Sequence, residues 1–322
     1  MGMKKIAVLT SGGDAPGMNA AVRAVVRSGI NRGVKVYGIA RGYAGLINSE
    51  EFTEFEMGSV ADIIQRGGTI LLTAREPGMF EPDYQRKAVE RLKSEGIEGL
   101  VVIGGEGSFQ GAIALQDYGL KTVCIPGTID NDINGTEQTI GFDTAVNTIL
   151  DAINRLRDTA TSHERIFIIE VMGRETGYLA LAAGLAGGAE SILVPEIKFE
   201  IDEVCARLLR GIKRRKAHSI IVVAEGAANV FELHSQIKKR IEAETRVTVL
   251  GHIQRGGSPS AVDRLLGSRM GAMAVDLLLE GKSGYFTAVK GHDLVPVPLD
   301  ICIAEKKSFP EDLYKLALDL AK

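Results

Sequence analysis

KKIAVLT at residues 4–10 runs directly into SGGDAPGMN at residues 11–19, and the stretch AAVRAVVRSGI follows at 20–30. The first segment is apolar on successive positions, which is typical of a strand buried on both faces of a sheet. The glycines therefore stand at a strand-to-helix turn, where free backbone N–H groups and the helix dipole favour an anion. The stretch predicts the first βαβ unit of an α/β protein and a phosphate-handling loop.

Apolar runs of the same kind recur along the chain and alternate with amphipathic stretches. Further strands are expected in VKVYGIA, GLVVIGG, KTVCIPG, RIFIIEV, SILVPE, HSIIVVAEG and TRVTVLGH. Helical spacing of apolar residues predicts helices over 17–31, 82–95, 107–118, 143–159, 175–186 and 202–216. The fold class is therefore expected to be α/β, with two Rossmann-like doubly wound domains whose sheets are mostly parallel.

Composition limits the classes of partner. The 322 residues are 45% apolar and 25% charged, which is ordinary for a globular protein of about two domains. The formal net charge is only -3, aromatic residues make up 5% and tryptophan is absent. A global basic field and base-stacking aromatics are thus both missing, and we expect neither nucleic-acid nor membrane binding.

The cysteines and the N-terminal segment bear on location. Cys124, Cys205 and Cys302 are odd in number, far apart and outside any CxxC pattern, as expected of core residues in a reducing compartment. The apolar run Ile6 to Leu9 is too short for a signal-peptide core or a membrane span. We expect a cytoplasmic protein.

PGTIDND at residues 126–132 places Asp130, Asn131 and Asp132 directly behind an apolar strand. Crowded carboxylates repel one another and suit a site that handles a proton or a metal. An Asx-rich turn is the alternative interpretation of this segment by itself. The two glycine loops that also follow strands favour the chemical interpretation.

GGEGS at residues 104–108 is the second glycine loop. The first loop is not a Walker P-loop, because Met18 and Asn19 follow Gly17 where that pattern needs Lys and Ser or Thr. Gly105, Gly107 and Gly111 resemble a loose dinucleotide fingerprint, which is the alternative. Glu106 argues against it, because a carboxylate beside a phosphate makes sense if Mg²⁺ bridges the two charges.

Cationic residues follow the later strands, in TATSHER at 159–165, VMGRETG at 171–177 and ETRVTVLGHIQRGG at 244–257. Singly, each could be a solvated surface charge. Together they could hold a second phosphate, because guanidinium groups bind phosphate oxygens bidentately. The residues concerned are Arg165, Arg174, Arg246, His252 and Arg255. Two phosphate sites, a metal and a base are what phosphoryl transfer requires.

These motifs give the chain a specific resemblance. GGDAPGMNA, GGEGS, PGTIDNDI, TIGFDTA, RDTATSHER, VMGR and GHIQRGGSP stand in the order and spacing of the bacterial ATP-dependent 6-phosphofructokinases, over nearly the whole length. The resemblance implies transfer of the γ-phosphoryl group of Mg-ATP to the 1-hydroxyl of fructose 6-phosphate in glycolysis, by a homotetramer. It also implies an ATP-binding larger domain at 1–139 and 252–304 and a sugar-phosphate-binding smaller domain at 140–251 and 305–322.

The resemblance assigns roles residue by residue. Asp130 is the implied general base, with Thr128, Asp132, Arg174 and Arg75 as further catalytic residues. The implied ATP site comprises Gly13, Tyr43, Arg75, Glu76, Gly105, Glu106, Gly107, Ser108 and Gly111, with Glu106 on the metal. The implied sugar-phosphate site comprises Thr128, Ile129, Asp130, Arg165, Met172, Gly173, Arg174, Glu225, Arg246, His252, Ile253, Gln254 and Arg255. Arg165 and Arg246 are expected to reach in from a neighbouring subunit.

An effector pocket for ADP or phosphoenolpyruvate is also implied, at Arg23, Arg27, Arg157, Glu190, Arg214, Lys216 and His218. Glu50 or Glu51 stands where an effector-binding Arg is expected, and Ala217 where a Lys is. An anion in place of a cation beside a phosphate is unfavourable, so we expect weakened or altered effector control. The alternative for KRRK at 213–216 is a solvated helix face.

The chain also departs from the family pattern around the nucleotide. Glu106 replaces the usual Asp of the family, and Glu76, Pro77, Gly78 and Met79 differ from the usual residues after Arg75. The family resemblance implies ATP rather than pyrophosphate as donor, because pyrophosphate-using relatives typically carry Asp at the position of Gly107 and Lys at that of Gly127. Two rival functions stay open beside these kinases, namely a non-catalytic nucleotide sensor and a dinucleotide oxidoreductase.

Overall fold

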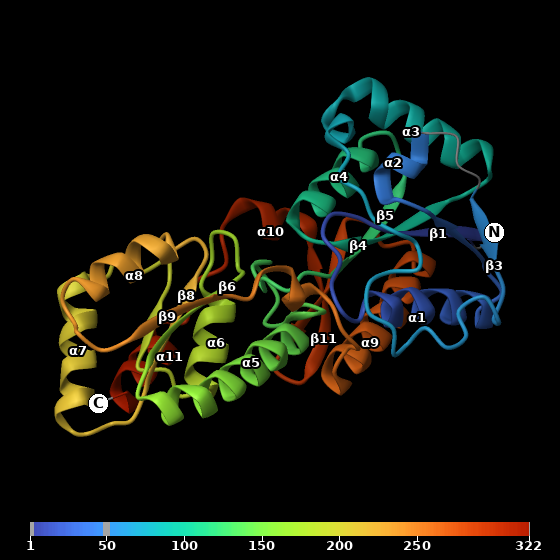
Figure 1. Ribbon diagram of the computed structural model, residues 1–322. Coiled ribbons are helices and arrows are strands. Elements are labelled where there is room, and N and C mark those ends of the chain that lie inside the picture. Colours follow the sequence, from blue (N-terminus) through green and yellow to red (C-terminus); the bar gives the residue numbers. More distant parts are fainter. Residues whose placement is uncertain (1–2, 48–51, 322) are drawn as a thin grey trace. The chain divides into compact units, whose positions relative to one another are not determined.

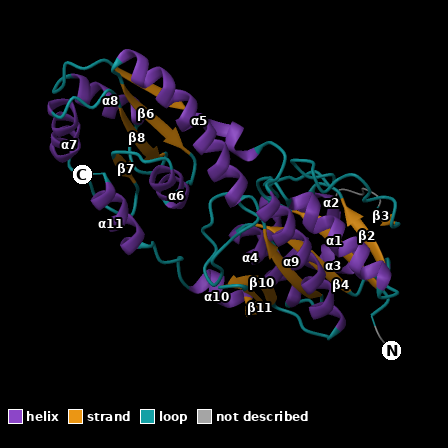
Figure 2. Cartoon of the chain, turned by 90° about the horizontal axis from the view of Figure 1, so that it is seen from below, coloured by secondary structure: helices purple, strands orange, loops and turns teal. Residues whose placement is uncertain are grey.

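The computed structural model describes residues 3–47 and 52–321, and the chain forms two compact units (Figure 1). Unit 1 comprises the described residues of Met1–Thr144 and Arg255–Lys307. Unit 2 comprises those of Ala145–Gln254 and Ser308–Lys322. Each unit has its own sheet, covered by helices on both faces, so each can bury a core of its own (Figure 2).

The sheet of unit 1 has the strand order β11-β10-β5-β4-β1-β2-β3. Its strands are β1 (Lys5–Thr10), β2 (Lys35–Ile39), β3 (Thr53–Phe55), β4 (Gly99–Gly104), β5 (Lys121–Pro126), β10 (Tyr285–Lys290) and β11 (Asp293–Pro298). The pairs among β2, β1, β4, β5 and β10 are parallel, and β3 and β11 pair antiparallel at the two edges. The carboxyl ends of β1, β4 and β5 therefore meet at one edge of the sheet, where the three polar motifs begin.

Helices cover both faces of this sheet. They are α1 (Met18–Asn31), α2 (Gly42–Ile47), α3 (Pro82–Ser94), α4 (Glu106–Gln116), α9 (Ala261–Leu279) and α10 (Leu299–Ala304), with the short 3-10 helix η1 (Pro77–Phe80). In Figure 1, α1 and α9 lie on one side of the strands, and α2, α3 and α4 lie on the other. Side chains of the latter three helices, among them Phe109 of α4, form one buried apolar cluster with Leu9 of β1 and Leu100 of β4.

Unit 2 contains a smaller parallel sheet with the strand order β7-β8-β6-β9. Its strands are β6 (Ile166–Val171), β7 (Ser191–Leu193), β8 (Ser219–Ala224) and β9 (Thr245–Val249). Its helices are α5 (Phe142–His163), whose first three residues belong to unit 1, α6 (Tyr178–Ala186), α7 (Ile201–Lys213), α8 (Val230–Lys238) and α11 (Glu311–Leu320), with the 3-10 helix η2 (Gly251–Arg255) at the unit boundary. Residues of α7 and α8 form one apolar cluster with the sheet, and α6 contacts β7 and β8.

The expected α/β class with mostly parallel sheets is confirmed. Each helix expected from apolar spacing is present within a few residues of its expected bounds, and each expected strand is found, although SILVPE is extended only over Ser191–Leu193. The elements that were not predicted are the β10–β11 hairpin, β3, α2, α8, α9, α10 and α11. Helix α9 packs against α1 and β5 with one face, and its exposed face carries the apolar residues Val262 and Leu265, so it lacks a clear polar stripe.

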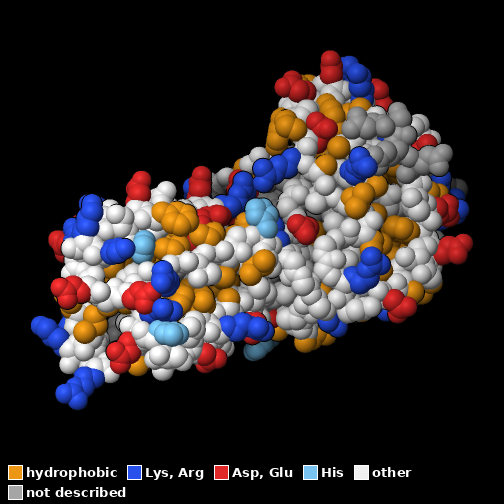
Figure 3. All heavy atoms as spheres, in the orientation of Figure 1, with side chains coloured by type: hydrophobic (Ala, Val, Ile, Leu, Met, Phe, Trp, Pro, Cys, Tyr) orange, Lys and Arg blue, Asp and Glu red, His pale blue; other side chains and the backbone are white. Residues whose placement is uncertain are grey.

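The surface carries charges of both signs. On the face shown in Figure 3, acidic and basic side chains are interspersed over each unit. This agrees with the formal net charge of -3. In the described part of the chain, no helix combines the length and the apolar character that crossing a membrane would require.

Candidate active site

The loop at residues 11–19 leaves the carboxyl end of β1 and is held by hydrogen bonds to two other segments. The Ser11 N–H donates to the Ile103 carbonyl at 2.9 Å, and the Thr73 hydroxyl donates to the Gly12 carbonyl at 2.8 Å. The buried side chain of Asn19 accepts from the Ile70 N–H at 2.8 Å and donates to the Arg66 carbonyl at 3.1 Å. Asn19 therefore anchors the segment that leads to Arg75, a role that the motif alone did not indicate.

The side chain of Arg255 contacts this loop. Its Nη1 donates to the Asp14 carbonyl at 3.2 Å, and a Cβ atom at position 13 would lie 2.5 Å from the same nitrogen. Gly13 thus leaves room for the guanidinium of Arg255. This residue was expected at the sugar-phosphate site, and within unit 1 it stands beside the glycine of the expected nucleotide site.

The second loop adjoins both the first and the third. The Gly127 N–H donates to the Gly104 carbonyl at 2.9 Å, and a Cβ atom at Gly105 would lie 3.9 Å from Cβ of Thr128. Helix α4 begins at Glu106, so its first N–H groups lie at this junction. Gly107 is exposed, and a Cβ atom there would meet nothing within 4 Å.

Tyr43 supports this loop from inside the protein. Its side chain is buried, its hydroxyl donates to the Ser108 carbonyl at 2.5 Å, and its ring fills the space beside Gly111. Burial raises the pKa of Tyr43 well above its ordinary value. Ser108 is buried as well. We infer that Tyr43 holds the first turns of α4 in position from the buried side of the helix.

Arg75 and Glu76 differ in exposure. Arg75 is exposed and lies two residues beyond Thr73, which is anchored to Gly12. The Glu76 carboxylate accepts from the Gly78 N–H at 3.0 Å and so caps η1. Glu76 therefore has a local structural role, whatever it contacts in a complex.

The segment 126–132 follows β5. The Asp130 N–H donates to the Thr128 hydroxyl at 3.2 Å, and the side chains of Asp130 and Ile129 are buried, whereas Asp132 is partly exposed. Asn131 is left-handed, with φ 53°, and its carbonyl accepts from Nζ of Lys307 at 2.9 Å. Lys307 was not predicted, because it lies 176 residues away in the chain.

In unit 2, the residues that follow β6 and β8 are joined by hydrogen bonds. The Arg174 N–H donates to the Glu225 carboxylate at 2.8 Å, and the Glu225 N–H donates to the Val171 carbonyl at 2.9 Å. Gly173 and Arg174 both have positive φ, so the chain turns sharply there. Met172, Gly173, Arg174 and Glu225 are therefore brought together at one edge of this sheet.

The residues after β9 join the same edge. Gln254 is fully buried, its side chain accepts from the Met172 N–H at 3.2 Å, and it donates to the Gly251 carbonyl at 2.9 Å. His252 and Ile253, which lie between these contacts in η2, are exposed. Gln254 thus connects two backbone segments, and His252 presents its ring to solvent.

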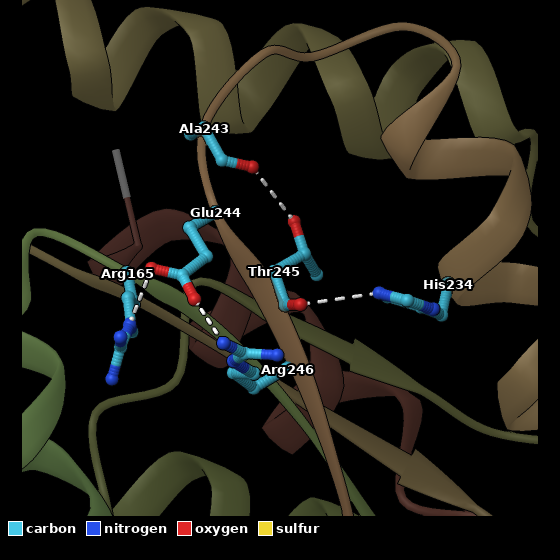
Figure 4. A network of polar contacts seen from close by, with 6 residues as sticks. All are labelled: Arg165, His234, Ala243, Glu244, Thr245 and Arg246. Atoms are coloured by element: carbon cyan, nitrogen blue, oxygen red, sulfur yellow. Dashed lines mark hydrogen bonds and ion pairs between the residues drawn. The ribbon is translucent and has the colours of Figure 1, made fainter.

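Arg165 and Arg246 share one carboxylate (Figure 4). Arg165 donates to Glu244 at 2.7 Å, and Arg246 bonds to the other oxygen of the same side chain. The ion pairs, Arg165 foremost, lower the pKa of Glu244. Glu244 was not predicted, although it stands two residues before Arg246 on an extended segment, where side chains share a face.

Five of the residues expected at an effector site lie in unit 2. Glu190 forms an ion pair with Lys216 and accepts from the Ile220 N–H. The His218 ring contacts the Thr161 hydroxyl at 3.0 Å, and burial lowers the pKa of His218.

Arg157, which contacts the Gly187 carbonyl, completes the group in unit 2 together with Arg214. Arg23 and Arg27 lie on α1 of unit 1. Glu50 and Glu51 lie outside the described residues. Ala217 is partly exposed.

A cavity of about 500 Å³ adjoins this group, between α7 and α11. Glu190, Arg214 and Lys216 line it, and the sequence did not single out the other charged residues at its wall, Arg207, Arg210, Lys315 and Asp319. Basic residues outnumber acidic ones in this wall, so it is suited to an anion. The available signal was the spacing of Arg207 and Arg210 on α7 and of Arg214 directly after it, by three and four residues.

The candidate metal ligand is Glu106. Its exposed side chain accepts from Gln110 at 3.1 Å. Within residues 3–47 and 52–321, no three His, Cys, Asp or Glu side chains converge as a metal site. A single carboxylate is nevertheless compatible with Mg²⁺, which is usually held by one or two carboxylates together with substrate phosphates.

Comparisons with known proteins give one consistent answer. The family model described as Phosphofructokinase matches residues 5–278. The chain is 57% identical to an ATP-dependent 6-phosphofructokinase of Bacillus cytotoxicus and 58% identical to one of Halalkalibacterium halodurans, over 99% of this chain and 100% of each relative.

Solved structures agree on the fold. The phosphofructokinase of Saccharomyces cerevisiae matches with a TM-score of 0.89 and 33% identity, over 98% of this chain and 50% of that chain, so the chain spans half the length of the yeast protein. A pyrophosphate-dependent phosphofructokinase from Marinobacter aquaeolei matches with a TM-score of 0.87 at 23% identity, over 96% of this chain and 86% of that one. The latter similarity concerns the fold alone.

Proposed function

Because the chain belongs to the phosphofructokinase family, we infer that it works as an ATP-dependent 6-phosphofructokinase. It transfers the γ-phosphoryl group of ATP to the 1-hydroxyl of fructose 6-phosphate and yields fructose 1,6-bisphosphate and ADP, a step of glycolysis. The observation that carries this conclusion is the identity of 56–58% to curated bacterial ATP-dependent enzymes over 99% of the chain. We assign ATP binding to unit 1 and sugar-phosphate binding to unit 2.

Gly107 is compatible with ATP as the donor. A Cβ atom at this position would meet nothing within 4 Å, so glycine leaves the start of α4 open for the rest of the nucleotide. Gly127 is more crowded, because a Cβ atom there would lie 3.0 Å from Met18 and 3.1 Å from Ile103.

In the proposed reaction, Asp130 accepts the proton of the attacking 1-hydroxyl as general base. The Thr128 hydroxyl, which accepts from the Asp130 N–H, orders the backbone of this segment. Arg75 neutralises charge on the transferring phosphoryl group, for which its exposed side chain is available. Asp132 and Arg174 are proposed as further catalytic residues.

Mg²⁺ belongs to this proposal through Glu106. The ion, when bound, would supply positive charge that neutralises the phosphates of the nucleotide. Glu106 would hold it from the first turn of α4, with Gln110 orienting the carboxylate. The first N–H groups of α4 and the loop containing Gly13 would bind the phosphates themselves.

The sugar phosphate is proposed to bind at the edge formed by Met172, Gly173, Arg174 and Glu225 in unit 2, with His252. Further proposed contacts come from Arg165 and Arg246 of a neighbouring subunit in a homotetramer. The cavity between α7 and α11 is proposed to bind a phosphorylated effector such as ADP or phosphoenolpyruvate. We propose a cytoplasmic location, in keeping with three free, buried cysteines.

The test is formation of fructose 1,6-bisphosphate from fructose 6-phosphate, with ATP or pyrophosphate as donor and with Mg²⁺ or EDTA present. We expect turnover with ATP and Mg²⁺ alone. Asp130→Asn should lower kcat by about 10²- to 10⁴-fold, and Asp117→Asn, an exposed carboxylate after α4, should leave it unchanged. Turnover with pyrophosphate alone would refute the proposed donor, and no turnover with either would favour a nucleotide sensor.

A further inference from the structure

Asp263 is a buried carboxylate that takes no part in the reaction described above. It lies in the first turn of α9, and its side chain is 0% exposed. It accepts from the N–H groups of Gly141 and Thr144, each at 2.8 Å, and from the Thr144 hydroxyl at 2.5 Å. The Ser260 N–H donates to the same hydroxyl at 2.9 Å, so residues 141–144 are fastened to the start of α9.

The hydrogen bonds to Asp263 offset the unfavourable free energy of burying its carboxylate. Burial raises the pKa of the Asp263 carboxyl, and the hydrogen bonds from Thr144 and Gly141 oppose that shift. A buried carboxylate is tolerated only where its oxygen atoms are well satisfied, and an apolar residue of similar size would avoid the cost. The carboxylate is therefore better explained by the segment that it holds than by packing.

The segment that Asp263 holds is in turn paired with the catalytic segment. The Thr128 N–H donates to the Ile140 carbonyl at 3.1 Å, and the Ile140 N–H donates to the Pro126 carbonyl at 2.9 Å. The Thr139 hydroxyl donates to the Thr128 carbonyl at 2.6 Å. Both peptide groups of Thr128 are thus held by residues 139–140, and the hydroxyl of Thr128 accepts from the N–H of Asp130.

The same junction reaches the nucleotide loop. Gly141 has φ 105°, and a Cβ atom there would lie 2.6 Å from Cβ of Ala15. Gly17 has φ 104°, and a Cβ atom there would lie 2.7 Å from Ile140 and 3.2 Å from Asp263. Both conformations are ones that glycine adopts without penalty. The loop at 11–17, the segment 139–144 and the start of α9 therefore meet in direct contact.

We propose that Asp263 is a positioning residue for phosphoryl transfer. Through residues 139–144, it sets the segment that carries Asp130 relative to the loop that receives the nucleotide. This rests on the proposed function and extends it, because it assigns a role to TIGFDTA at 139–145, for which no role had been derived. Removal of the carboxylate slows the chemical step without removing any group that touches a substrate.

The first test is Asp263→Asn, with kcat and KM measured well below the thermal midpoint. The amide nitrogen of the variant can only donate, so one of the N–H groups of Gly141 and Thr144 loses its acceptor. We expect kcat to fall about 10- to 100-fold, because small displacements of reacting groups have effects of this size. KM for each substrate should stay within about twofold, because the binding groups are unchanged.

Two control variants separate positioning from stability. Val275→Ala creates a cavity in the same helix, about three turns further on, and should lower the thermal midpoint while kcat stays unchanged. Thr144→Ser keeps the hydroxyl and should retain kcat, whereas Thr144→Val keeps the shape without the hydroxyl and should lose part of it. If Asp263→Asn fails to fold, the two Thr144 variants decide the question.

Hydrogen exchange gives a readout that does not depend on activity. Asp263→Asn should accelerate exchange of the Thr128 and Ile140 amides much more than that of the Val101 amide in β4. Unchanged kcat together with unchanged exchange at Thr128 would overturn the proposal. Absence of activity in the unsubstituted protein would instead overturn the proposed function. The exchange of the Thr128 and Ile140 amides would still show whether Asp263 holds their segment in place.

Discussion

Lys307 offers a test of how the buried polar contacts of unit 1 respond to pH. Its Nζ donates to the Asn131 carbonyl at 2.9 Å and to the Glu137 carbonyl at 3.3 Å, next to the proposed base. Burial lowers the pKa of Lys307 from 10.5 to about 8, although Asp132 and Glu137 act in the opposite direction. The perturbation is Lys307→Met, which keeps the length of the side chain and removes the titrating group.

The magnitude follows from the difference between the folded and unfolded pKa. A shift of this size means that the buried, charged lysine lowers the free energy of unfolding by about 3 kcal/mol at neutral pH, because one pKa unit is about 1.4 kcal/mol. Between pH 8 and 10.5, the unfolded chain binds a proton at this lysine that the folded chain has released, so the free energy of unfolding rises with pH. The penalty is fully present below pH 8 and disappears as the pH approaches 10.5.

The assay is urea denaturation of the unsubstituted protein and of Lys307→Met at fixed protein concentration, at about pH 7 and about pH 9.5. Linkage predicts that the free energy of unfolding of the unsubstituted protein, relative to the variant, increases by about 2 kcal/mol over that interval. Lys290→Met removes an exposed lysine of the same unit and controls for the loss of one positive charge. A difference between the two proteins that is constant or falls with pH would refute the reasoning.

Two further predictions concern single contacts. Tyr43→Phe removes the buried hydrogen bond to the Ser108 carbonyl, and it should lower the free energy of unfolding by about 1–2 kcal/mol in urea denaturation. It should also raise KM for ATP more than KM for fructose 6-phosphate. Equal effects on the two KM values would contradict a role of Tyr43 in supporting the start of α4. Glu244→Gln removes the ion pairs that hold Arg165 and Arg246. Initial rates should then show half-saturation at a concentration of fructose 6-phosphate about two- to fivefold lower. A higher half-saturating concentration would mean that the ion pairs orient the arginines for binding.

Much of the fold could be predicted from the sequence because its signals are local. In β1 and the loop that follows it, the apolar run and the glycines are neighbours in the chain, so one short window contains both the strand and its turn. The same holds for β4 with residues 104–108 and for β5 with residues 126–132. In each case the carboxyl end of a parallel strand was expected to carry the chemistry, and the motifs do begin there.

Other features gave no local signal. Helix α9 was not predicted, because its exposed face carries the apolar residues Val262 and Leu265 while its buried face carries Asp263, and this weakens the contrast by which amphipathic helices are recognised. The β10–β11 hairpin was also missed. It extends the sheet at the edge next to β5, a position that depends on pairing between segments far apart in the chain.

By itself, the sequence determined the α/β class, the strand-to-helix loops and the residue types available for phosphoryl transfer. Only the tertiary structure decided which distant groups hold those loops in place. Asp263 reaches Gly141 across 122 residues, Lys307 reaches Asn131 across 176, and Arg255 reaches Asp14 across 241. The physical reason is that secondary structure depends on neighbours within a few residues, whereas a buried polar group is satisfied by whichever partner the folding of its own unit brings near.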